Sequence, residues 1–236
     1  MNQVTDQQII EILRKEAVPA LGCTEPVACA LACAKCKEVL GDVPEHLDVL
    51  VSGNIYKNGM GVGIPGTGMV GLPIAAALGA VCGKSEYGLE VLKEVNVGDN
   101  LQRAKDMLGQ VKVSLKEDAP DKLYAEALAT KGNDTVKVII VHTHTNIVLV
   151  EKNGKEIFKR EFRLDTSKPE DKGPELSVKR IWDFVHQVDV KDIEFVLQGA
   201  EMNKAISAEG LKSEYGLQIG KTLKENIDKG LLEDDL

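Results

Sequence analysis

Residues 24–40 of the chain are TEPVACALACAKCKEVL, and they predict a long, strongly helical segment. Alanine has the highest helix propensity of the amino acids and lets a helix pack closely against its neighbours. Gly41 follows directly and is typical of the residue just beyond a helix. Cys29, Cys33 and Cys36 recur among the alanines at helical spacing. We therefore expect a helix over residues 24–40 with a face of small side chains in the core.

The segments on either side of this helix extend the pattern. Before it, Thr5 and Gln8 have the spacing of a capping box and predict a first helix that ends near Pro19. After it, residues 47–52 predict a short strand. Seven glycines fall within residues 53–71, and such a cluster indicates that backbone approaches another group closely. Residues 72–81 then predict a buried helix lined with small side chains.

The pattern changes from about residue 89, where alternating and β-branched residues become common. Asn153-Gly154 is a strong signal for a two-residue hairpin turn. The expected elements before that turn are a helix over 97–108, a half-buried strand over 111–115, either a helix or a strand over 123–130, and two strands within 136–150 around residues 144–146.

The last part of the chain predicts helices again. Residues 167–174, SKPEDKGP, predict a polar linker. Residues 230–236, GLLEDDL, resemble an unfinished element, so we expect the chain to be part of a longer protein. The helical signals between them are one apolar stripe of Val178, Ile181, Trp182 and Val185, a second of Ile193, Val196, Leu197 and Ala200 with Gly210 as its stop, and a last helix over 217–228.

Composition excludes several classes of protein. The chain has 236 residues, with 29 basic against 37 acidic residues and a net charge of -8, which is no basic footprint for nucleic acid. The longest apolar run, residues 70–82, is shorter than a membrane span of about 20 residues. The five cysteines do not form a disulfide framework, and the first residues do not resemble a secretion signal. We expect a cytoplasmic protein without membrane or nucleic-acid partners.

Cys23 is the first candidate for chemistry. It lies in Gly22-Cys23-Thr24-Glu25-Pro26, just before the helix predicted over 24–40. Backbone N–H groups and the helix dipole stabilise an anion at such a position, so the sequence predicts a thiol with a lowered pKa that could act as base, nucleophile or ligand. The alternative is a buried cysteine with a packing role.

The other cysteines have a simpler explanation. Cys29, Cys33 and Cys36 match the C-x3-C-x2-C spacing of a radical iron–sulfur motif. That motif occupies a loop, whereas these residues lie among alanines within a predicted helix, so we expect core residues. Cys82 is also expected to be structural, and we predict no metal ligand within this chain.

Three further patterns carry alternatives. Residues 61–66 satisfy the G-x-G-x-x-G pattern, but the fingerprint needs a strand directly before it and a helix directly after it. A nest of backbone N–H groups for a carboxylate or a glycine-rich packing turn explains it equally well. Lys57 could pair with a carboxylate or be an ordinary surface residue. His142 and His144 would share one strand face, either as polar surface residues or as metal ligands without a nearby acidic partner.

Three motifs together resemble a known family. GCTEP at 22–26, SGNIYKNGMGVGIPGTGMVGLPIAAALGA at 52–80 and HTNIV at 144–148 are similar to the L-cysteine desulfidase family, which is related to the alpha chain of iron–sulfur L-serine dehydratase. The resemblance implies an oxygen-sensitive [4Fe–4S] lyase without pyridoxal phosphate that converts L-cysteine to pyruvate, ammonia and sulfide. It implies Cys23 as the catalytic base. The substrate-binding residues that these motifs supply are Thr24, Glu25, Asn54, Lys57, Asn58, Gly66, Thr67, Gly68, His144, Thr145 and Asn146.

The resemblance also implies an organisation. Family members are nearly twice as long and carry their cluster ligands in the second half, so this chain resembles the N-terminal part and could be inactive alone. We expect an α+β fold, with a helical dehydratase-like domain from 1–88 and 168–236, incomplete at its C-terminus, and an α+β insertion from 89–167. The alternatives are L-serine dehydration, or a non-catalytic amino-acid-binding or assembly module that lacks the cluster. A homo-oligomer is compatible with all of these.

Overall fold

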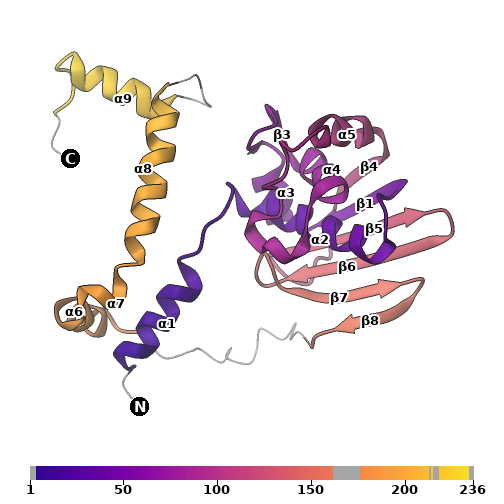
Figure 1. The fold of residues 1–236 in the computed structure, drawn as a ribbon, viewed down its shortest axis with the longest axis horizontal. Helices are drawn as coiled ribbons and strands as arrows, with labels where there is room; N and C mark the ends of the chain where they lie inside the picture. The colour runs from indigo at the N-terminus through magenta and orange to yellow at the C-terminus, as the bar shows by residue number, and fades with distance from the viewer. Residues whose placement is uncertain (1–3, 162–175, 213, 215–217, 234–236) are drawn as a thin grey trace. The chain divides into compact units, whose positions relative to one another are not determined.

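The computed structural model describes residues 4–161, 176–212, 214 and 218–233. The chain divides into two compact units, one of residues 19–170 and one of residues 1–18 with 171–236. We call the first the sheet unit and the second the helical unit. Helices and a mixed six-stranded sheet make this an α+β protein, as the sequence predicts (Figure 1).

The sheet unit is built on six strands in the order β4-β1-β5-β6-β7-β8. β1 pairs in parallel with β4 and antiparallel with β5, and every later neighbour is antiparallel. A separate two-stranded hairpin joins β2 and β3. The strands are β1 (His46–Val51), β2 (Gly63–Ile64), β3 (Met69–Val70), β4 (Val111–Leu115), β5 (Tyr124–Lys131), β6 (Asp134–Val141), β7 (Ile147–Lys152) and β8 (Lys155–Lys159).

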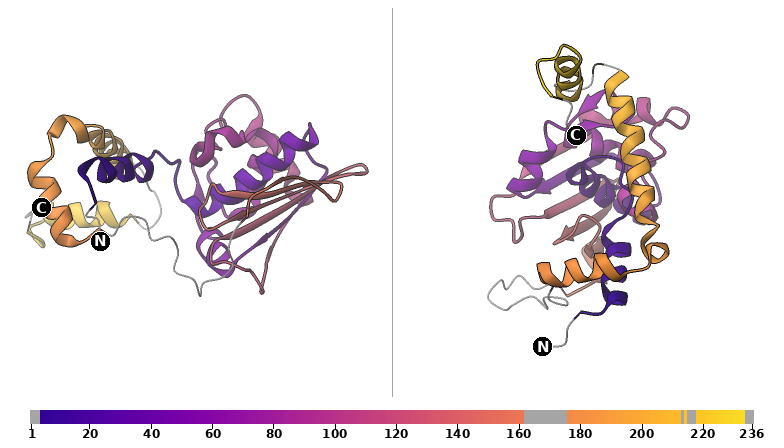
Figure 2. Two further views of the ribbon diagram at one scale, coloured as in Figure 1. Left: turned by 90° about the horizontal axis from the view of Figure 1, so that it is seen from below. Right: turned by 90° about the vertical axis from the view of Figure 1, so that its left-hand side faces the viewer.

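Helices cover one face of this sheet, and α2 packs directly on β5 and β6 (Figure 2). Ten of the 17 residues of α2 are buried, which agrees with the apolar and small residues that make up most of its sequence. α3 begins where β1 ends and was not predicted, because glycine disfavours helices. The helices of this unit are α2 (Thr24–Leu40), α3 (Gly53–Gly59), α4 (Leu72–Cys82) and α5 (Asn100–Met107), with 3-10 turns η1 (Ser85–Glu90) and η2 (Leu108–Gln110).

α2 and α4 pack so closely that only glycine fits between them. A Cβ atom on Gly79 would lie 2.2 Å from the carbonyl oxygen of Ala30. One on Gly83 would lie 2.8 Å from the Cβ atom of Ala34. The alanines and cysteines of α2 therefore form core contacts. The expectation of a closely packed, small-residue helix is confirmed.

Local signals placed several elements correctly. Gly41 ends α2 in the left-handed conformation with φ 87°. Asn153 and Gly154 have φ values of 52° and 75° and turn β7 into β8, as a type I′ turn requires. Residues 123–130, which fitted either a helix or a strand, lie mainly in β5, where Ala125, Ala127 and Ala129 alternate toward the core.

The helical unit has a small core of its own. Thr5 and Gln8 form the predicted capping box of α1. Phe184 of α6 packs with Val4 and Ile9, while the Nε atom of Arg180 donates to the carbonyl oxygen of Val4 at 2.6 Å. The helices are α1 (Asp6–Glu16), α6 (Val178–Gln187), α7 (Val190–Ile193), α8 (Val196–Lys212) and α9 (Ile219–Asp228).

The division of the chain differs from the predicted one. β1 lies between β4 and β5, so the described residues 89–161 do not form a separate insertion but share one sheet and one core with residues 19–88. α8 continues through Gly210 instead of stopping there. The polar linker predicted over 167–174 lies outside the described residues. Within the described segments, no helix combines the length and apolar character that a membrane crossing needs.

Candidate functional site

The start of α2 forms a tight corner around Cys23. Cys23 is the residue before the helix, and its side chain does not cap the backbone. Instead its Sγ donates to Oε2 of Glu25 at 2.9 Å. Gly22 precedes it with φ 99°, and a Cβ atom there would lie 3.1 Å from Cγ of Pro65. The first motif and the glycine-rich block therefore meet at this corner, where only glycine is unstrained.

Glu25 connects three segments that are distant in sequence. Its Oε1 accepts from Nδ2 of Asn58 on α3 at 3.0 Å, while Oε2 accepts from Cys23. His144, from the loop between β6 and β7, interacts with the Glu25 carboxylate electrostatically. Four of the residues predicted from the sequence are thus brought together around one carboxylate.

The protonation states at this corner follow from these contacts. Burial, followed by the hydrogen bond to Glu25, raises the pKa of the Cys23 thiol above its ordinary value. The hydrogen bond from Cys23 leads the causes that lower the pKa of Glu25. Burial lowers the pKa of His144, against the attraction of Glu25. At neutral pH the corner therefore holds a thiol, a carboxylate and a mostly neutral imidazole. The expectation of a low-pKa thiolate is wrong, because burial and the nearby carboxylate oppose the helix dipole.

The histidine loop differs from its predicted geometry. His142 and His144 do not share a strand face, since β6 ends at Val141 and His142 adopts φ 67°. Nδ1 of His142 lies 2.5 Å from Oδ2 of Asp121, which holds the first histidine just beyond the end of β6. His144 lies two residues further along in the loop. The left-handed conformation at His142 is what the sequence did not reveal.

Thr145 and Asn146 help to build this loop. Nδ2 of Asn146 donates to the carbonyl oxygen of Val141 at 3.0 Å, and its Oδ1 accepts from Arg160 at 2.8 Å. Thr145 lies beside Gly88 of η1, where a glycine Cβ would be 3.8 Å from its Cγ2 atom. These contacts tie Asn146, two residues after His144, to the end of β6 and to Arg160.

The predicted glycine nest is a turn between β2 and β3. Thr67 is buried there; its hydroxyl donates to the carbonyl oxygen of Ile64 at 2.6 Å and accepts from the Met69 N–H at 2.9 Å. Gly66 and Gly68 have φ values of 77° and 66°. The turn therefore satisfies Thr67 internally. No helix follows the G-x-G-x-x-G pattern directly, so it lacks the helix N-terminus on which a dinucleotide phosphate would bind.

Two clefts adjoin these residues. The larger, of about 580 Å³, lies where the parallel strands β1 and β4 end. The smaller, of about 190 Å³, lies beside Pro65 and Gly66. The larger cleft is lined by Ser52, Gly53, Asn54, Lys116, Glu117, Ala119, Pro120, Asp121 and Lys122. The smaller is lined by Leu21, Pro65, Gly66, Leu92, Lys93, Val95 and Asn96.

The lining residues show what sequence reasoning missed. Of the lining of the larger cleft, only Asn54 was predicted as a site residue. Asn54 and Asn58 lie four residues apart on α3 and so share a helix face, which links the cleft to Glu25. Lys57 is exposed on the same helix. Lys116 and Asp121 reach the cleft only because β4 pairs with β1. No local sequence pattern predicts that pairing, so these two residues could not be identified from the sequence.

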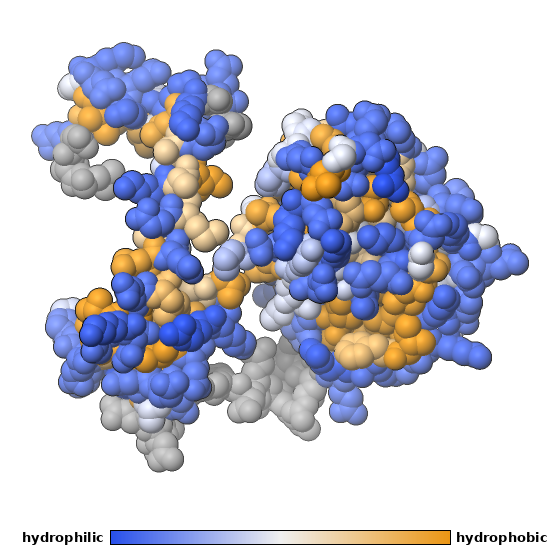
Figure 3. Space-filling model, in the orientation of Figure 1, coloured by the Kyte–Doolittle hydropathy of each residue, from blue (hydrophilic) through white to orange (hydrophobic). Residues whose placement is uncertain are grey.

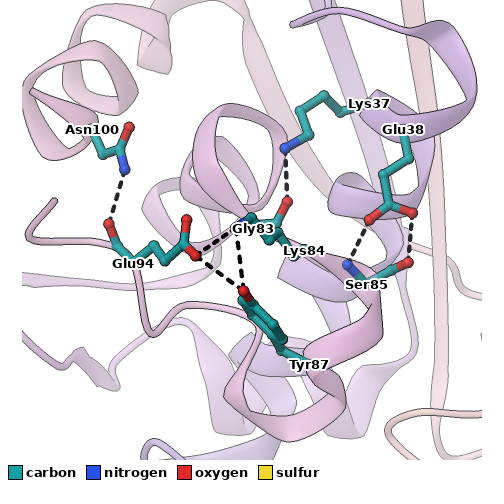
Figure 4. Close-up of polar contacts among 8 residues, drawn as sticks. All are labelled: Lys37, Glu38, Gly83, Lys84, Ser85, Tyr87, Glu94 and Asn100. Carbon is teal, nitrogen blue, oxygen red and sulfur yellow. Dashed lines mark hydrogen bonds and ion pairs between the residues drawn. The ribbon is translucent and has the colours of Figure 1, made fainter. Parts of the chain in front are cut away.

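A polar network holds the segment that follows α4 against α2 (Figure 4). It joins two residues of α2 to residues 83–100. On the α2 side, Lys37 Nζ donates to the Gly83 carbonyl at 2.7 Å, and the N–H and hydroxyl of Ser85 donate to Glu38 at 2.7 and 2.6 Å. Around Glu94, its carboxylate accepts from Lys84 Nζ at 2.7 Å and from Tyr87 Oη at 3.1 Å, and its carbonyl accepts from Asn100 Nδ2 at 2.9 Å. Lys84 Nζ also donates to Tyr87 Oη at 3.2 Å. The network fixes η1, whose Gly88 lies against the histidine loop.

The remaining cysteines do not fit an iron–sulfur cluster. Cys29, Cys33 and Cys36 are fully buried in α2, and Cys82 is buried in α4. Burial raises the pKa of all four thiols, that of Cys29 to about 12, which opposes the thiolate form that binds iron. Among the described residues, no group of three or more His, Cys, Asp or Glu side chains could hold a metal ion.

Comparison with known proteins gives relatives whose name states no activity. Proteins called "UPF0597 protein" are 46% identical over 236 residues in Dichelobacter nodosus, 45% over 230 in Aeromonas hydrophila and 43% over 240 in Parabacteroides distasonis. These alignments cover 99%, 96% and 99% of this chain but 54%, 52% and 55% of the relatives. No family model and no solved structure matches. The chain therefore spans about half the length of the curated UPF0597 relatives to which it is similar.

Proposed function

We propose that this chain forms part of a lyase that eliminates the β-substituent of a small amino acid, converting L-cysteine to pyruvate, ammonia and sulfide. The observation that carries the proposal is the meeting of Cys23, Asn58 and His144 around the Glu25 carboxylate. These residues come from the three motifs that resemble the L-cysteine desulfidase family. Motifs that serve only packing have no reason to converge on one half-buried acid.

The contacts support a defined role for each side chain. Cys23 is a thiol whose proton already points to the Glu25 carboxylate at 2.9 Å. When substrate binds, Glu25 accepts that proton as Cys23 Sγ takes the α-proton, so that a new S–H bond forms as the old S–H proton moves to the carboxylate. The electron pair of the broken Cα–H bond forms the Cα=Cβ bond while the Cβ–S bond breaks and the sulfur leaves as hydrosulfide. Water then hydrolyses the 2-aminoacrylate product, through its imine tautomer, to pyruvate and ammonia. A neutral His144 can accept a hydrogen bond from an amino group. The thiol thus acts as a base without having to be ionised beforehand.

The larger cleft suits a zwitterionic ligand. Its lining carries cations from Lys116 and Lys122 and anions from Glu117 and Asp121. An amino acid needs both signs, one for its carboxylate and one for its ammonium group. Asn54 lies in this lining, one helical turn from Asn58. We propose that the substrate carboxylate binds near the lysines, with Thr24, Lys57 and the Gly66–Gly68 turn toward the rim.

The [4Fe–4S] cluster is proposed for the complete protein only. The buried thiols of this chain do not fit it, so its ligands would come from sequence that the relatives have and this chain does not match. The proposed lyase reaction does not use pyridoxal phosphate. L-serine is an alternative substrate, since the proposed transfer of the α-proton to Cys23 is the same for both amino acids. The mixed-charge cleft also supports a second candidate, an amino-acid-binding module without turnover.

The first test measures binding by this chain alone. Isothermal titration with L-cysteine and L-serine is carried out on the unmodified chain and on Cys23→Ala and Glu25→Gln. Glu86→Gln, an exposed glutamate of η1, is the matched control for loss of one charge. We expect saturable binding that Glu25→Gln weakens and Glu86→Gln does not. Binding that is absent, or insensitive to Glu25, would contradict the site.

The second test measures chemistry. The chain is combined anaerobically with the unmatched segment of the Dichelobacter nodosus relative, iron and sulfide, and pyruvate is followed. We expect Cys23→Ala to abolish pyruvate formation, whereas Cys82→Ala keeps it. Full turnover in the Cys23 variant would remove this residue from the mechanism. Tight amino-acid binding without pyruvate in any preparation would favour the binding module.

A further inference from the structure

The helical unit exposes a continuous apolar stripe on α6. Val178, Ile181, Trp182 and Val185 recur at positions i, i+3, i+4 and i+7, so they lie along one helix face. Their exposed fractions are 85%, 45%, 64% and 55%. The opposite side of the same helix is used within the unit, since Phe184 packs on α1. We call these four residues the α6 stripe.

α8 also exposes apolar side chains, although it contacts α9. None of its 17 residues is buried. The exposed apolar side chains are Val196, Leu197, Met202, Ile206 and Leu211, with exposed fractions of 43%, 59%, 50%, 70% and 37%. Its four charged residues, Glu201, Lys204, Glu209 and Lys212, fall within about 140° of the helix circumference, and most of the rest is apolar or small. The uncharged side therefore adds apolar surface to that of α6.

Single exposed apolar residues are normal, but a contiguous apolar patch marks an interaction surface. Figure 3 shows apolar side chains interspersed along the helices of this unit. The stripe contains the single tryptophan of the chain, and tryptophan is enriched at the centres of binding interfaces. The stripe therefore has the composition of an interface core.

The relatives indicate what covers this surface. This chain matches only 54% of the Dichelobacter nodosus relative and 52% of the Aeromonas hydrophila relative, so each contains nearly as much sequence again. We propose that the α6 stripe and the apolar surface of α8 bind a polypeptide equivalent to that unmatched segment. The contact is made by aliphatic and aromatic side chains, with Trp182 at its centre. This inference is independent of the lyase activity.

The test uses the full chain together with the unmatched segment of the Dichelobacter nodosus relative, co-expressed. Ile181→Glu introduces a charge into the stripe. Gln187→Glu adds the same charge to an exposed position of α6 outside the stripe and is the matched control. Light scattering gives the stoichiometry, and the emission of Trp182 reports burial of the stripe.

We expect a 1:1 complex in which Trp182 emission shifts to shorter wavelength. Ile181→Glu should weaken the complex at least about thirtyfold, as at an interface hot spot, while Gln187→Glu leaves it within about twofold. If the segment is insoluble alone, a single polypeptide joining it to the chain gives the same fluorescence and hydrogen-exchange readouts at residues 178–185.

Three outcomes would overturn the proposal. One is a complex that Ile181→Glu does not weaken. Another is a joined polypeptide in which Trp182 and the α6 amides stay as exposed as in the chain alone. The third is a dimer of this chain that Ile181→Glu disperses, which would assign the surface to a second copy. None of these readouts depends on pyruvate formation, so the lyase proposal stands or falls separately.

Discussion

Two helices of equal length are stabilised in different ways in the two units. α2 and α8 each have 17 residues, but ten residues of α2 are buried and none of α8 is. α2 packs on the sheet and on α4, whereas α8 makes its main helix contacts with α9. Short helices are marginal in water unless tertiary packing supports them. The comparison teaches that α2 forms part of a core, whereas α8 has most of its side chains exposed, which is why we propose a binding surface there.

The largest difference should come from removing one aliphatic side chain from each helix. Leu31 is 1% exposed and Ile206 is 70% exposed. We expect Leu31→Ala to destabilise the sheet unit by about 2–5 kcal/mol, since a buried cavity is left. Ile206→Ala should change the helical unit by less than about 0.5 kcal/mol.

Hydrogen exchange resolved by peptide measures each unit separately, because two units need not unfold together. A loss of more than about 1 kcal/mol in the Ile206 variant would break the comparison. It would mean that α8 is already packed within the chain, and it would also weaken the proposed docking surface.

Substituting one glycine beside α2 and one in α8 should change the stability of the two units in opposite directions. A Cβ on Gly79 of α4 would meet the backbone of Ala30 in α2 at 2.2 Å, whereas Gly199 of α8 has nothing within 4 Å. We expect Gly79→Ala to destabilise by about 1–3 kcal/mol through overpacking. Gly199→Ala should stabilise α8 by up to about 1 kcal/mol through helix propensity. Urea unfolding followed by exchange measures both, and the same sign for both would contradict the close approach of α2 and α4.

The thiols of the α2 segment differ between its start and its interior. Cys23 is partly exposed and Cys33 is fully buried. In native protein, iodoacetamide should modify Cys23 faster as pH rises, because the thiolate reacts, and should leave Cys33 unmodified. Glu25→Gln removes a charge that raises the pKa of Cys23 and weakens the hydrogen bond that the thiol donates, because an amide oxygen is a poorer acceptor than a carboxylate. The rate at pH 8 should therefore increase about two- to tenfold. Peptide mass spectrometry measures the rate of Cys23 modification. An unchanged rate in Glu25→Gln would mean that burial alone raises the pKa of Cys23.

The smallest effect concerns the Glu25 carboxyl. Its pKa in the folded state lies below the ordinary value of 4.5, chiefly because Cys23 donates to it. Its contribution to stability is therefore present above about pH 4.5 and is lost as pH falls through the folded pKa. Cys23→Ala should raise this pKa toward 4.5 and flatten the acid limb of the stability curve. NMR titration of the Glu25 side chain measures this pKa. In the control variant Glu86→Gln, the pKa of Glu25 should not change.

Local chemistry predicted most elements but not their assembly. The capping box at Thr5, the stop at Gly41 and the turn at Asn153-Gly154 are encoded by a few neighbouring residues and were predicted correctly. The boundary at residue 89 differs from the structure, because the placement of β1 between β4 and β5 depends on pairing with distant strands.

The same limit applies to the site. The motifs indicated Cys23, Glu25, Asn58 and His144, and these residues do lie together. The sequence predicted a lowered pKa for Cys23, whereas its pKa is raised, because burial and the orientation of Glu25 are tertiary properties. The cleft at the ends of β1 and β4 was missed, because its lining forms only when two strands that are distant in sequence become neighbours.

α2 is synthesised long before the strands on which it packs. Sγ of Cys36 lies 3.5 Å from the carbonyl oxygens of Ala127 and Val136, which come 91 and 100 residues later. At about 5–20 residues per second, a ribosome needs roughly 5–20 s to supply that sheet. During this interval a mainly apolar helix has emerged without its partner strands. Translation speed over residues 37–136 therefore decides how long the nascent chain is open to aggregation and to chaperone capture.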